Sequence, residues 1–327
     1  MNGSLVGVGT TNVLITGAAG FIGSRLAASL ERDGVNVRAL VRQPGAHPRP
    51  LSQGERGKLR HREWVAGDLL DPEALMAACE GVETVFHCAG IAEAGGGIDE
   101  ASLWRVNVEG TRTLLEAAGR SGARRFVFLS SVKAMAEPGD GCVNEDWPGK
   151  PASAYGRTKR AAEEAVLEAG ARFGMHVVNL RLALVYGRGN RGNLWRLARL
   201  IRHFPFVRLP DGANRRSLVH VEDVVAAMRL AAERPEANGR TYIVADPRPY
   251  STREIEDAIR AALGLAGMPG VRIPAWALRG AGRLHPRLGE IAERLIGSAC
   301  YSPARIEQEL GWRARVGLTE GMREMLT

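Results

Sequence analysis

The chain has 327 residues, 45% of them hydrophobic and 24% charged, so it can bury a large core, and this composition excludes a disordered chain or a small disulfide-stapled domain. Its 44 lysines and arginines outnumber its 36 aspartates and glutamates, and the net charge of +8 favours an anionic partner. No basic leader precedes an apolar run, and no stretch of about 18 uncharged apolar residues occurs. We therefore expect a cytoplasmic protein without membrane insertion.

Four cysteines, Cys79, Cys88, Cys142 and Cys300, lie far apart in the sequence and include no CxxC pair. Such spacing indicates neither a zinc site nor a disulfide framework. We therefore expect four buried, reduced thiols and no metal ion.

The first half of the chain alternates short runs of branched and aromatic residues with helical patterns. Asp71 and Pro72, for example, open one such pattern, because aspartate can cap a helix and proline suits its first turn. Strand alternating with helix predicts a doubly wound, parallel α/β sheet of the Rossmann type, covered on both faces. The predicted strands are 13–16, 35–41, 64–66, 84–86 and 126–129.

The rhythm of strand and helix breaks after a further apolar run at 176–180, and a smaller C-terminal domain is expected beyond it. A later strand pattern at 241–244 is expected to return to the first sheet. We assign residues 1–180, together with 221–250, to a dinucleotide-binding domain. Residues 181–220 and 251–327 are assigned to a substrate-binding domain.

A glycine-rich loop at 16–23 follows the first predicted strand and leads into a predicted helix. Its glycines permit a tight turn, close approach of the backbone to a pyrophosphate and close helix packing, and the helix N-terminus offers free N–H donors. A glycine-rich turn without a ligand is the alternative. The dinucleotide contacts expected here are Gly17, Gly20, Phe21, Ile22 and Gly23.

Two positions after later strands bear on the choice of dinucleotide. Asp68 and Leu69 follow the third strand, at a place where a carboxylate can accept from an adenine amino group; a turn or capping aspartate is the alternative. Arg42 ends the second strand, where a carboxylate would favour NAD and an arginine accommodates the 2′-phosphate of NADP. The sequence therefore favours NADP(H), with NAD as the alternative.

Tyr155 and Lys159 open a predicted helix with the spacing that places them on one helical face. The pair is informative because the chain has only four lysines. A free phenol titrates near pH 10 and needs neighbouring positive charge to act as an acid or base near neutrality, which Lys159 can supply. Ser131 ends the fifth predicted strand, at the sheet edge where ligands bind in such folds, and is predicted to polarise a substrate oxygen.

These features together resemble the extended short-chain dehydrogenase/reductase superfamily, which includes the NAD-dependent epimerases and dehydratases, over nearly the whole chain. The sequence Phe-His-Cys-Ala-Gly at 86–90 is similar to the family's fourth-strand motif, and Asn-Val-Glu-Gly-Thr at 107–111 to its helix motif. The resemblance implies a homodimer formed through the helices near Asn107 and Tyr155. It also implies four further cofactor contacts, at Cys88, Ala89, Gly90 and Asn107.

In the second half, the segments 184–187 and 216–223 resemble nucleotide-sugar epimerases and dehydratases. The resemblance implies that Arg216 contacts the substrate diphosphate, with Asn193 and Arg294 as weaker substrate-binding candidates.

Four shorter segments, 130–133, 191–193, 214–218 and 295–298, are similar to a bacterial polysaccharide subgroup. Its members include 4-reductases of UDP-2-acetamido-2,6-dideoxy-4-hexulose and UDP-sugar 4-epimerases. Two departures concern the sugar pocket. Arg-Leu-Ala at 181–183 replaces the usual Arg-Pro-x, and Met135-Ala136 replaces the Tyr-Gly of many epimerases.

Three functions follow from this sequence, the first being NADPH-dependent reduction of a UDP-4-keto-6-deoxy-N-acetylhexosamine in bacterial polysaccharide precursor synthesis. The second is 4-epimerisation of a UDP-sugar with tightly held NAD. The third is a catalytically inactive, cofactor-binding regulatory protein, against which the retention of Ser131, Tyr155 and Lys159 argues. Nucleic acid is not an expected partner, because the arginines are dispersed and no recognition motif occurs.

Overall fold

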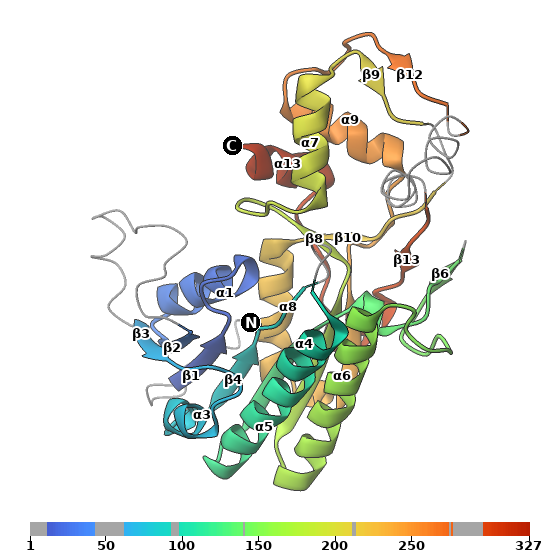
Figure 1. Cartoon of the computed structure of the whole chain (residues 1–327). Helices are drawn as coiled ribbons and strands as arrows, with labels where there is room; N and C mark the ends of the chain where they lie inside the picture. The colour runs from blue at the N-terminus through green and yellow to red at the C-terminus, as the bar shows by residue number, and fades with distance from the viewer. Residues whose placement is uncertain are drawn as a thin grey trace.

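The structure of the chain is a computed structural model. It describes residues 12–42, 62–92, 98–139, 141–210, 214–274, 276 and 297–327. Its centre is a seven-stranded parallel sheet with the strand order β11-β7-β5-β4-β1-β2-β3 (Figure 1). The predicted doubly wound sheet is confirmed, and the strand that follows the break in rhythm does return to it. The seven strands are β1 (Asn12–Thr16), β2 (Asn36–Val41), β3 (Arg62–Ala66), β4 (Thr84–His87), β5 (Arg125–Ser131), β7 (His176–Leu182) and β11 (Arg240–Val244).

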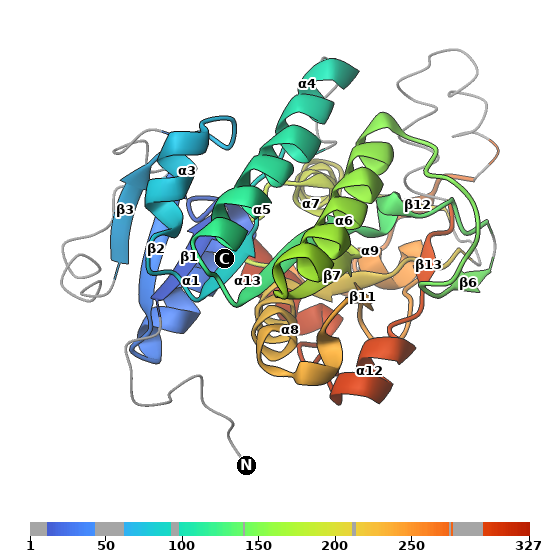
Figure 2. The same ribbon diagram turned by 90° about the horizontal axis from the view of Figure 1, so that it is seen from below.

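Helices cover both faces of this sheet (Figure 2). On one face α1 (Phe21–Arg32) and α8 (Val221–Glu233) bury leucines, valines and alanines in one large core. The other face buries a second core under α3 (Pro72–Cys79), α5 (Gly110–Arg120) and α6 (Ala154–Phe173). The central strands β1 and β4 are buried over most of their length because helices cover both faces of the sheet there, whereas the edge strand β3 has no buried residue.

Two helical segments that the sequence predicted are formed in the structure. Asp71 caps α3 by accepting hydrogen bonds from Glu73 and Ala74, and Pro72 occupies the first turn. The helix motif around Asn107 forms one continuous helical segment, in which α4 (Glu100–Trp104) runs through a π-helical stretch at Arg105–Glu109 into α5. Stretches of π-helix are rare and occur frequently at functional sites.

A smaller C-terminal lobe lies beyond the carboxyl ends of the strands and has its own apolar core (Figure 1). The core is formed by three helices, α7 (Asn193–His203), α9 (Thr252–Ala262) and α13 (Leu318–Leu326). Helix α12 (Ala304–Leu310) packs instead with β11. The short strands, in parallel pairs, are β8 (Leu184–Tyr186) with β10 (Leu218–His220), β9 (Val207–Arg208) with β12 (Val271–Arg272), and β6 (Cys142–Val143) with β13 (Cys300–Tyr301). Among the described residues, no helix combines the length and apolarity that crossing a membrane requires.

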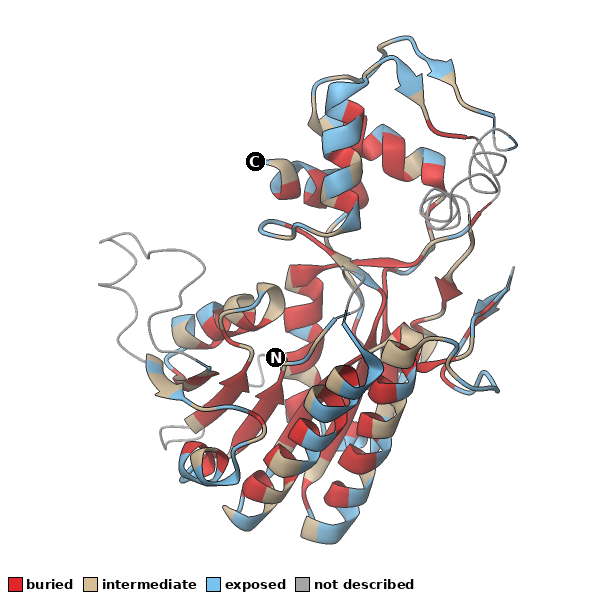
Figure 3. Cartoon of the chain, viewed as in Figure 1, coloured by how far each residue is buried: buried red, intermediate tan, exposed pale blue. Residues whose placement is uncertain are grey.

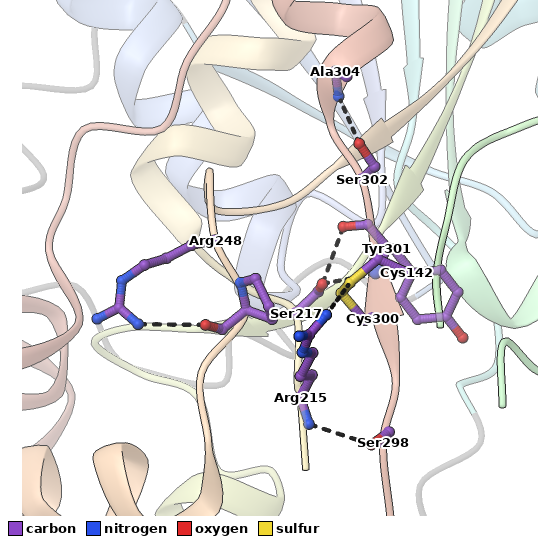
Figure 4. Close-up of a disulfide and its surroundings, with 10 residues drawn as sticks. Cys142, Arg215, Ser217, Arg248, Ser298, Cys300, Tyr301, Ser302 and Ala304 are labelled. Carbon is purple, nitrogen blue, oxygen red and sulfur yellow. Dashed lines mark hydrogen bonds between the residues drawn. A yellow bond between two sulfur atoms is a disulfide. The ribbon is translucent and has the colours of Figure 1, made fainter. Parts of the chain in front are cut away.

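The prediction of four reduced thiols was wrong for two of the cysteines. Cys142 and Cys300 form a disulfide across 158 residues of sequence (Figure 4). The two residues are register partners in the β6–β13 pair, and their Cα atoms lie 4.5 Å apart, within the range for a disulfide. Sequence spacing cannot reveal such a pairing. Cys79 and Cys88 are free, the first buried and the second half-buried.

We expect the double variant Cys142→Ser/Cys300→Ser to lose about 2–5 kcal/mol of unfolding free energy, because the disulfide closes a long loop in the unfolded chain. Urea unfolding with and without a reductant measures the loss. Reductant should lower the stability of the native protein to that of the variant and leave the variant unchanged. Unreduced, denatured protein should titrate as two thiols, from Cys79 and Cys88. Four thiols would contradict the disulfide.

Candidate active site

The glycine-rich loop joins β1 to α1 and can be built only with glycine at its start. Gly17 has a φ of +68°, and a Cβ there would lie 2.8 Å from the backbone nitrogen of Ala89. The turn is closed by a hydrogen bond from the Gly20 N–H to the Gly17 carbonyl, 2.8 Å long. Helix α1 then begins at Phe21 without a side-chain cap, so its first N–H groups are available to an anion. This arrangement fits a dinucleotide pyrophosphate.

Behind this loop, His87 at the end of β4 holds three elements together. Its Nδ1 lies 2.7 Å from the hydroxyl of Thr16 on β1, and its Nε2 lies 2.9 Å from the hydroxyl of Thr111 on α5. The Thr111 hydroxyl donates to the Asn107 carbonyl, so it accepts from Nε2–H, and Nδ1 accepts from Thr16. Burial, with the nearby Lys159 charge, lowers the pKa of His87 to about 3, so the imidazole stays neutral and has a structural role.

Lys159 lies inside the protein at the carboxyl edge of the sheet and is only 6% exposed. Its ammonium donates to the Leu129 carbonyl at 2.8 Å and lies 4.6 Å from the centre of the Phe128 ring. Burial lowers the pKa of Lys159 to about 8, while the Glu163 carboxylate acts in the opposite direction. The lysine is therefore held as a cation whose charge is lost at a pH not far above neutrality.

The backbone at Gly90 lies next to both this lysine and Asn107. A Cβ at Gly90 would lie 3.6 Å from the Lys159 ammonium and 3.0 Å from Asn107 Oδ1. Asn107 fixes this segment, because its amide accepts from the Ile91 N–H and donates to the Ile91 carbonyl. The structure therefore brings together Gly17, Cys88, Ala89, Gly90, Asn107 and Lys159 along one edge.

Tyr155 and Ser131 are brought together by the packing of α6 on the turn that follows β5. Helix α6 is capped by the Ser153 hydroxyl, and its first turn presses on that turn so closely that a Cβ at Gly156 would collide with the Lys133 carbonyl. Tyr155 is half-buried in this first turn. The hydroxyl oxygen of Ser131 accepts from the Lys133 N–H at 3.2 Å, and its proton has no acceptor within the described part of the chain. Ser131 can thus donate to a substrate oxygen.

A buried ion pair beneath this edge was not found by the sequence analysis. Arg181 on β7 donates to both carboxylate oxygens of Glu163, at 2.9 and 2.8 Å, and Ser130 donates to the same carboxylate at 2.6 Å. Both charged side chains are at most 5% exposed. Glu163 lies four residues after Lys159, so the spacing that identified Tyr155 and Lys159 also points to it. The pair fixes the strand end on which Ser131 sits.

The three remaining candidate cofactor contacts, Arg42, Asp68 and Leu69, follow β2 and β3 in the chain. Arg42 is exposed directly after β2, and neither of its neighbours in the sequence, Val41 and Gln43, is a carboxylate. Asp68 accepts from the Leu70 N–H at 2.9 Å and thus stabilises a turn, the alternative role considered for it. Leu69 is buried and lies so close to Gly110 that a Cβ there would be 2.8 Å from the Leu69 Cβ.

Two of the candidate substrate residues, Arg216 and Asn193, lie in the C-terminal lobe, and none of the contacts between described residues joins them. Arg216 precedes β10, and its backbone exchanges 2.8 Å hydrogen bonds with Tyr250 in both directions. Its backbone is also bridged to Ala299, the residue before the disulfide-bonded Cys300. Asn193 is the exposed first residue of α7. Arg294 lies outside the described residues. No group of three metal-ligating side chains was found among the residues that are described.

Comparison with known proteins gives a consistent family. The model of the NAD dependent epimerase/dehydratase family matches residues 13–245. The UDP-glucose 4-epimerase of Vibrio cholerae is 28% identical over 96% of this chain and 94% of its own. The 2-alkyl-3-oxoalkanoate reductase of Stenotrophomonas maltophilia is 29% identical over 96% and 98%. The solved structure of MoeE5 in complex with UDP-glucuronic acid and NAD is 31% identical, covers 96% and 97% of the two chains, and superposes with a TM-score of 0.76.

Proposed function

Because the chain belongs to the NAD dependent epimerase/dehydratase family, we propose that it reduces a UDP-4-keto-6-deoxy sugar with NADPH. It is an enzyme of the short-chain dehydrogenase/reductase superfamily, and the relatives include both epimerases and ketoreductases. The observation that carries the reductase is Arg42, a cation at the end of β2 where a ribose-binding carboxylate would favour NAD. A reductase consumes a reductant in every turnover, and NADPH is the usual one in biosynthesis. An epimerase returns the hydride that it removes and therefore needs no external reductant.

In the proposed reaction a bound dinucleotide would supply hydride to C4 of the sugar. Three side chains hold the C4 oxygen, donate its proton and stabilise the resulting charge. The Tyr155 phenol gives its proton to the C4 oxygen as that oxygen gains negative charge. The Ser131 hydroxyl donates a hydrogen bond to the same oxygen and holds it. The buried Lys159 ammonium stabilises the phenolate that remains and orients the nicotinamide ribose. The ketone thereby becomes an alcohol, and a solvent proton restores the tyrosine.

The rest of the proposal concerns binding, location and assembly. We assign dinucleotide binding to residues 1–180 with 221–250, and substrate binding to residues 181–220 with 251–327. The reaction is proposed to be a step in bacterial polysaccharide precursor synthesis. A homodimer through α5 and α6 is part of the proposal. So is a cytoplasmic location; disulfides are rare in that compartment, so the oxidation state of Cys142 and Cys300 in cells tests it.

A UDP-sugar 4-epimerase is the second candidate, favoured by the relative whose structure contains UDP-glucuronic acid and NAD. The identity of the dinucleotide, and whether it stays bound during purification, distinguishes the reductase from the epimerase. We would denature the purified protein, identify any released dinucleotide by chromatography, and titrate emptied protein with NADPH and NADH. Preferential binding of NADPH by a protein purified empty is expected for the reductase. Stoichiometric released NAD would assign the epimerase, and binding of neither would contradict both.

We expect Arg42→Asp to lower the ratio of NADPH to NADH affinity by about tenfold or more, because it replaces a partner of the 2′-phosphate by a repelling carboxylate. Dissociation constants from nicotinamide fluorescence measure the ratio. Arg32→Asp is the matched control, since Arg32 is an equally exposed arginine near the C-terminal end of α1. An unchanged ratio in Arg42→Asp would refute the assignment of NADP.

Arg216→Ala should weaken the binding of UDP alone by about ten- to a hundredfold, through loss of charge-assisted hydrogen bonds to the diphosphate. Calorimetric titration with UDP measures this. The neighbouring Arg215→Ala is the control, because that guanidinium lies 3.9 Å from Cys142 Sγ, beside the disulfide (Figure 4). Equal losses in the two variants would show that Arg216 is not a specific diphosphate ligand.

A further inference from the structure

We propose that the outer end of the C-terminal lobe docks on the surface of an anionic lipid bilayer. This end is formed by α7, β9 and β12, at the greatest distance from the central sheet (Figure 1). We call it the lobe-tip surface. It consists of five apolar residues, Leu200, Phe204, Phe206, Val207 and Val271, and three arginines, Arg196, Arg199 and Arg202.

The apolar residues are unusually exposed for their size. Phe204, Phe206 and Val271 are 57%, 60% and 79% exposed, and Figure 3 shows the two tip strands as largely exposed. Exposed single hydrophobic residues are common in proteins, but a contiguous group marks an interaction site.

The group is contiguous because its members are linked by short backbone contacts. The Phe204 N–H donates to the Leu200 carbonyl, so the two lie one helical turn apart on one side of α7. Val207 and Val271 are register partners in the β9–β12 pair, so their side chains point to the same face. The Val271 N–H donates to the Phe206 carbonyl at 2.8 Å and the Val207 N–H to the Phe204 carbonyl at 3.0 Å, so the end of α7 and the two tip strands are adjacent along the backbone.

The charge beside this group is strongly positive. Between residues 193 and 207 the chain has three arginines, all on α7, and no aspartate or glutamate. Arg208, the next residue, pairs with Glu256 and Asp257 of α9 and is not counted among the available cations. Arg196 and Arg202 are exposed and form no ion pair within the described ranges, and Arg199 stacks on the ring of Trp195. By contrast, exposed arginines elsewhere, such as Arg157 and Arg120, pair with carboxylates. The cations on α7 are thus available to an external anion.

A bilayer is the partner that fits this combination. Phenylalanine and aliphatic side chains on a protruding end can enter the boundary between lipid headgroups and acyl chains, while adjacent arginines meet the lipid phosphates. A second copy of this chain would bring the same arginines face to face across a two-fold axis, which is unfavourable. Docking of this kind requires no part of the chain to cross the membrane.

The test is co-sedimentation of the whole protein with vesicles of phosphatidylcholine alone or mixed with phosphatidylglycerol. The native protein should bind the mixed vesicles, and added salt should weaken the binding. Phe204→Ser/Phe206→Ser and Arg196→Glu/Arg202→Glu should each lower the partition coefficient at least about tenfold. Arg124→Glu/Arg234→Glu is the control, because it makes the same charge change at exposed arginines outside the lobe. Unchanged thermal unfolding and NADPH binding establish that all variants fold.

Several results would overturn the proposal. One is no binding to mixed vesicles, and another is binding that the control weakens as much as the tip variants do. Vesicle binding absent but duplex DNA bound through Arg196 and Arg202 would assign the surface to nucleic acid. A dimer in sedimentation equilibrium that dissociates in the phenylalanine variant would assign it to a contact between copies. None of these readouts depends on the identity of the reaction.

Discussion

Tyr155→Phe is expected to lower kcat by about 10²–10⁴-fold, because the variant has no phenolic proton to give to the substrate oxygen. The ring remains, so the packing of the first turn of α6 on the turn after Ser131 should persist. Dinucleotide affinity should therefore change little, since the glycine-rich loop and Lys159 are intact. Stopped-flow measurement of NADPH oxidation gives kcat, and fluorescence titration gives the affinity.

Ser131→Ala provides a graded comparison for this variant. It removes a hydrogen bond to the same oxygen but leaves the proton donor, so its loss in kcat should be smaller than that of Tyr155→Phe. Near-normal turnover by Tyr155→Phe would refute the assignment of the tyrosine as the acid. Equal loss of NADPH binding and of turnover would instead show that the tyrosine serves only cofactor binding.

Glu163→Gln is expected to move the alkaline limb of the pH–rate profile about one pH unit lower. Lys159 acts as a cation, and activity is lost as pH rises through its pKa of about 8. The Glu163 carboxylate raises that pKa, so removing its charge lowers the pKa further and the ammonium is lost at lower pH. Well below the shifted limb, activity should approach that of the native protein. Rates across the pH range at saturating NADPH measure the shift.

Glu164→Gln is the matched control for this effect. It removes the same charge from the next residue of α6, where the side chain is 70% exposed and pairs with Arg160 at 3.5 Å. Solvent screens that charge, so the profile should not move. A profile that moves equally in both variants, or in neither, would contradict a specific role for Glu163.

The same ion pair should matter for stability. Arg181→Met leaves the Glu163 carboxylate buried without its partner, and the loss expected for such a broken pair is about 3–5 kcal/mol. Denaturant unfolding measures this loss. Arg181→Met breaks the ion pair but keeps the Glu163 carboxylate, whereas Glu163→Gln removes that negative charge. Comparison of the two variants therefore separates the contribution of the pair to stability from the effect of the charge on the pH profile.

Much of the candidate site was predictable because it rests on local patterns. The glycine-rich loop, the Tyr155 and Lys159 pair and the strand-end Ser131 each occupy a fixed offset from a strand or helix boundary, and the order of the elements predicted the sheet. The function of Asp68 was left between two alternatives, and the hydrogen bond that it accepts from the Leu70 N–H is compatible with both. These signals need only the sequence near each residue.

The amino-acid sequence by itself determined the doubly wound sheet, the glycine-rich turn after β1 and the residues of the proposed chemistry, because steric and periodic constraints act between near neighbours in the chain. Only the tertiary structure decided that Arg181 pairs with Glu163, that His87 joins three elements, and that Cys142 meets Cys300 across 158 residues. It also decided which cations on α7 have no carboxylate partner among the described residues. Such contacts join residues that are distant in sequence, and the packing of the sheet, rather than spacing, brings them together.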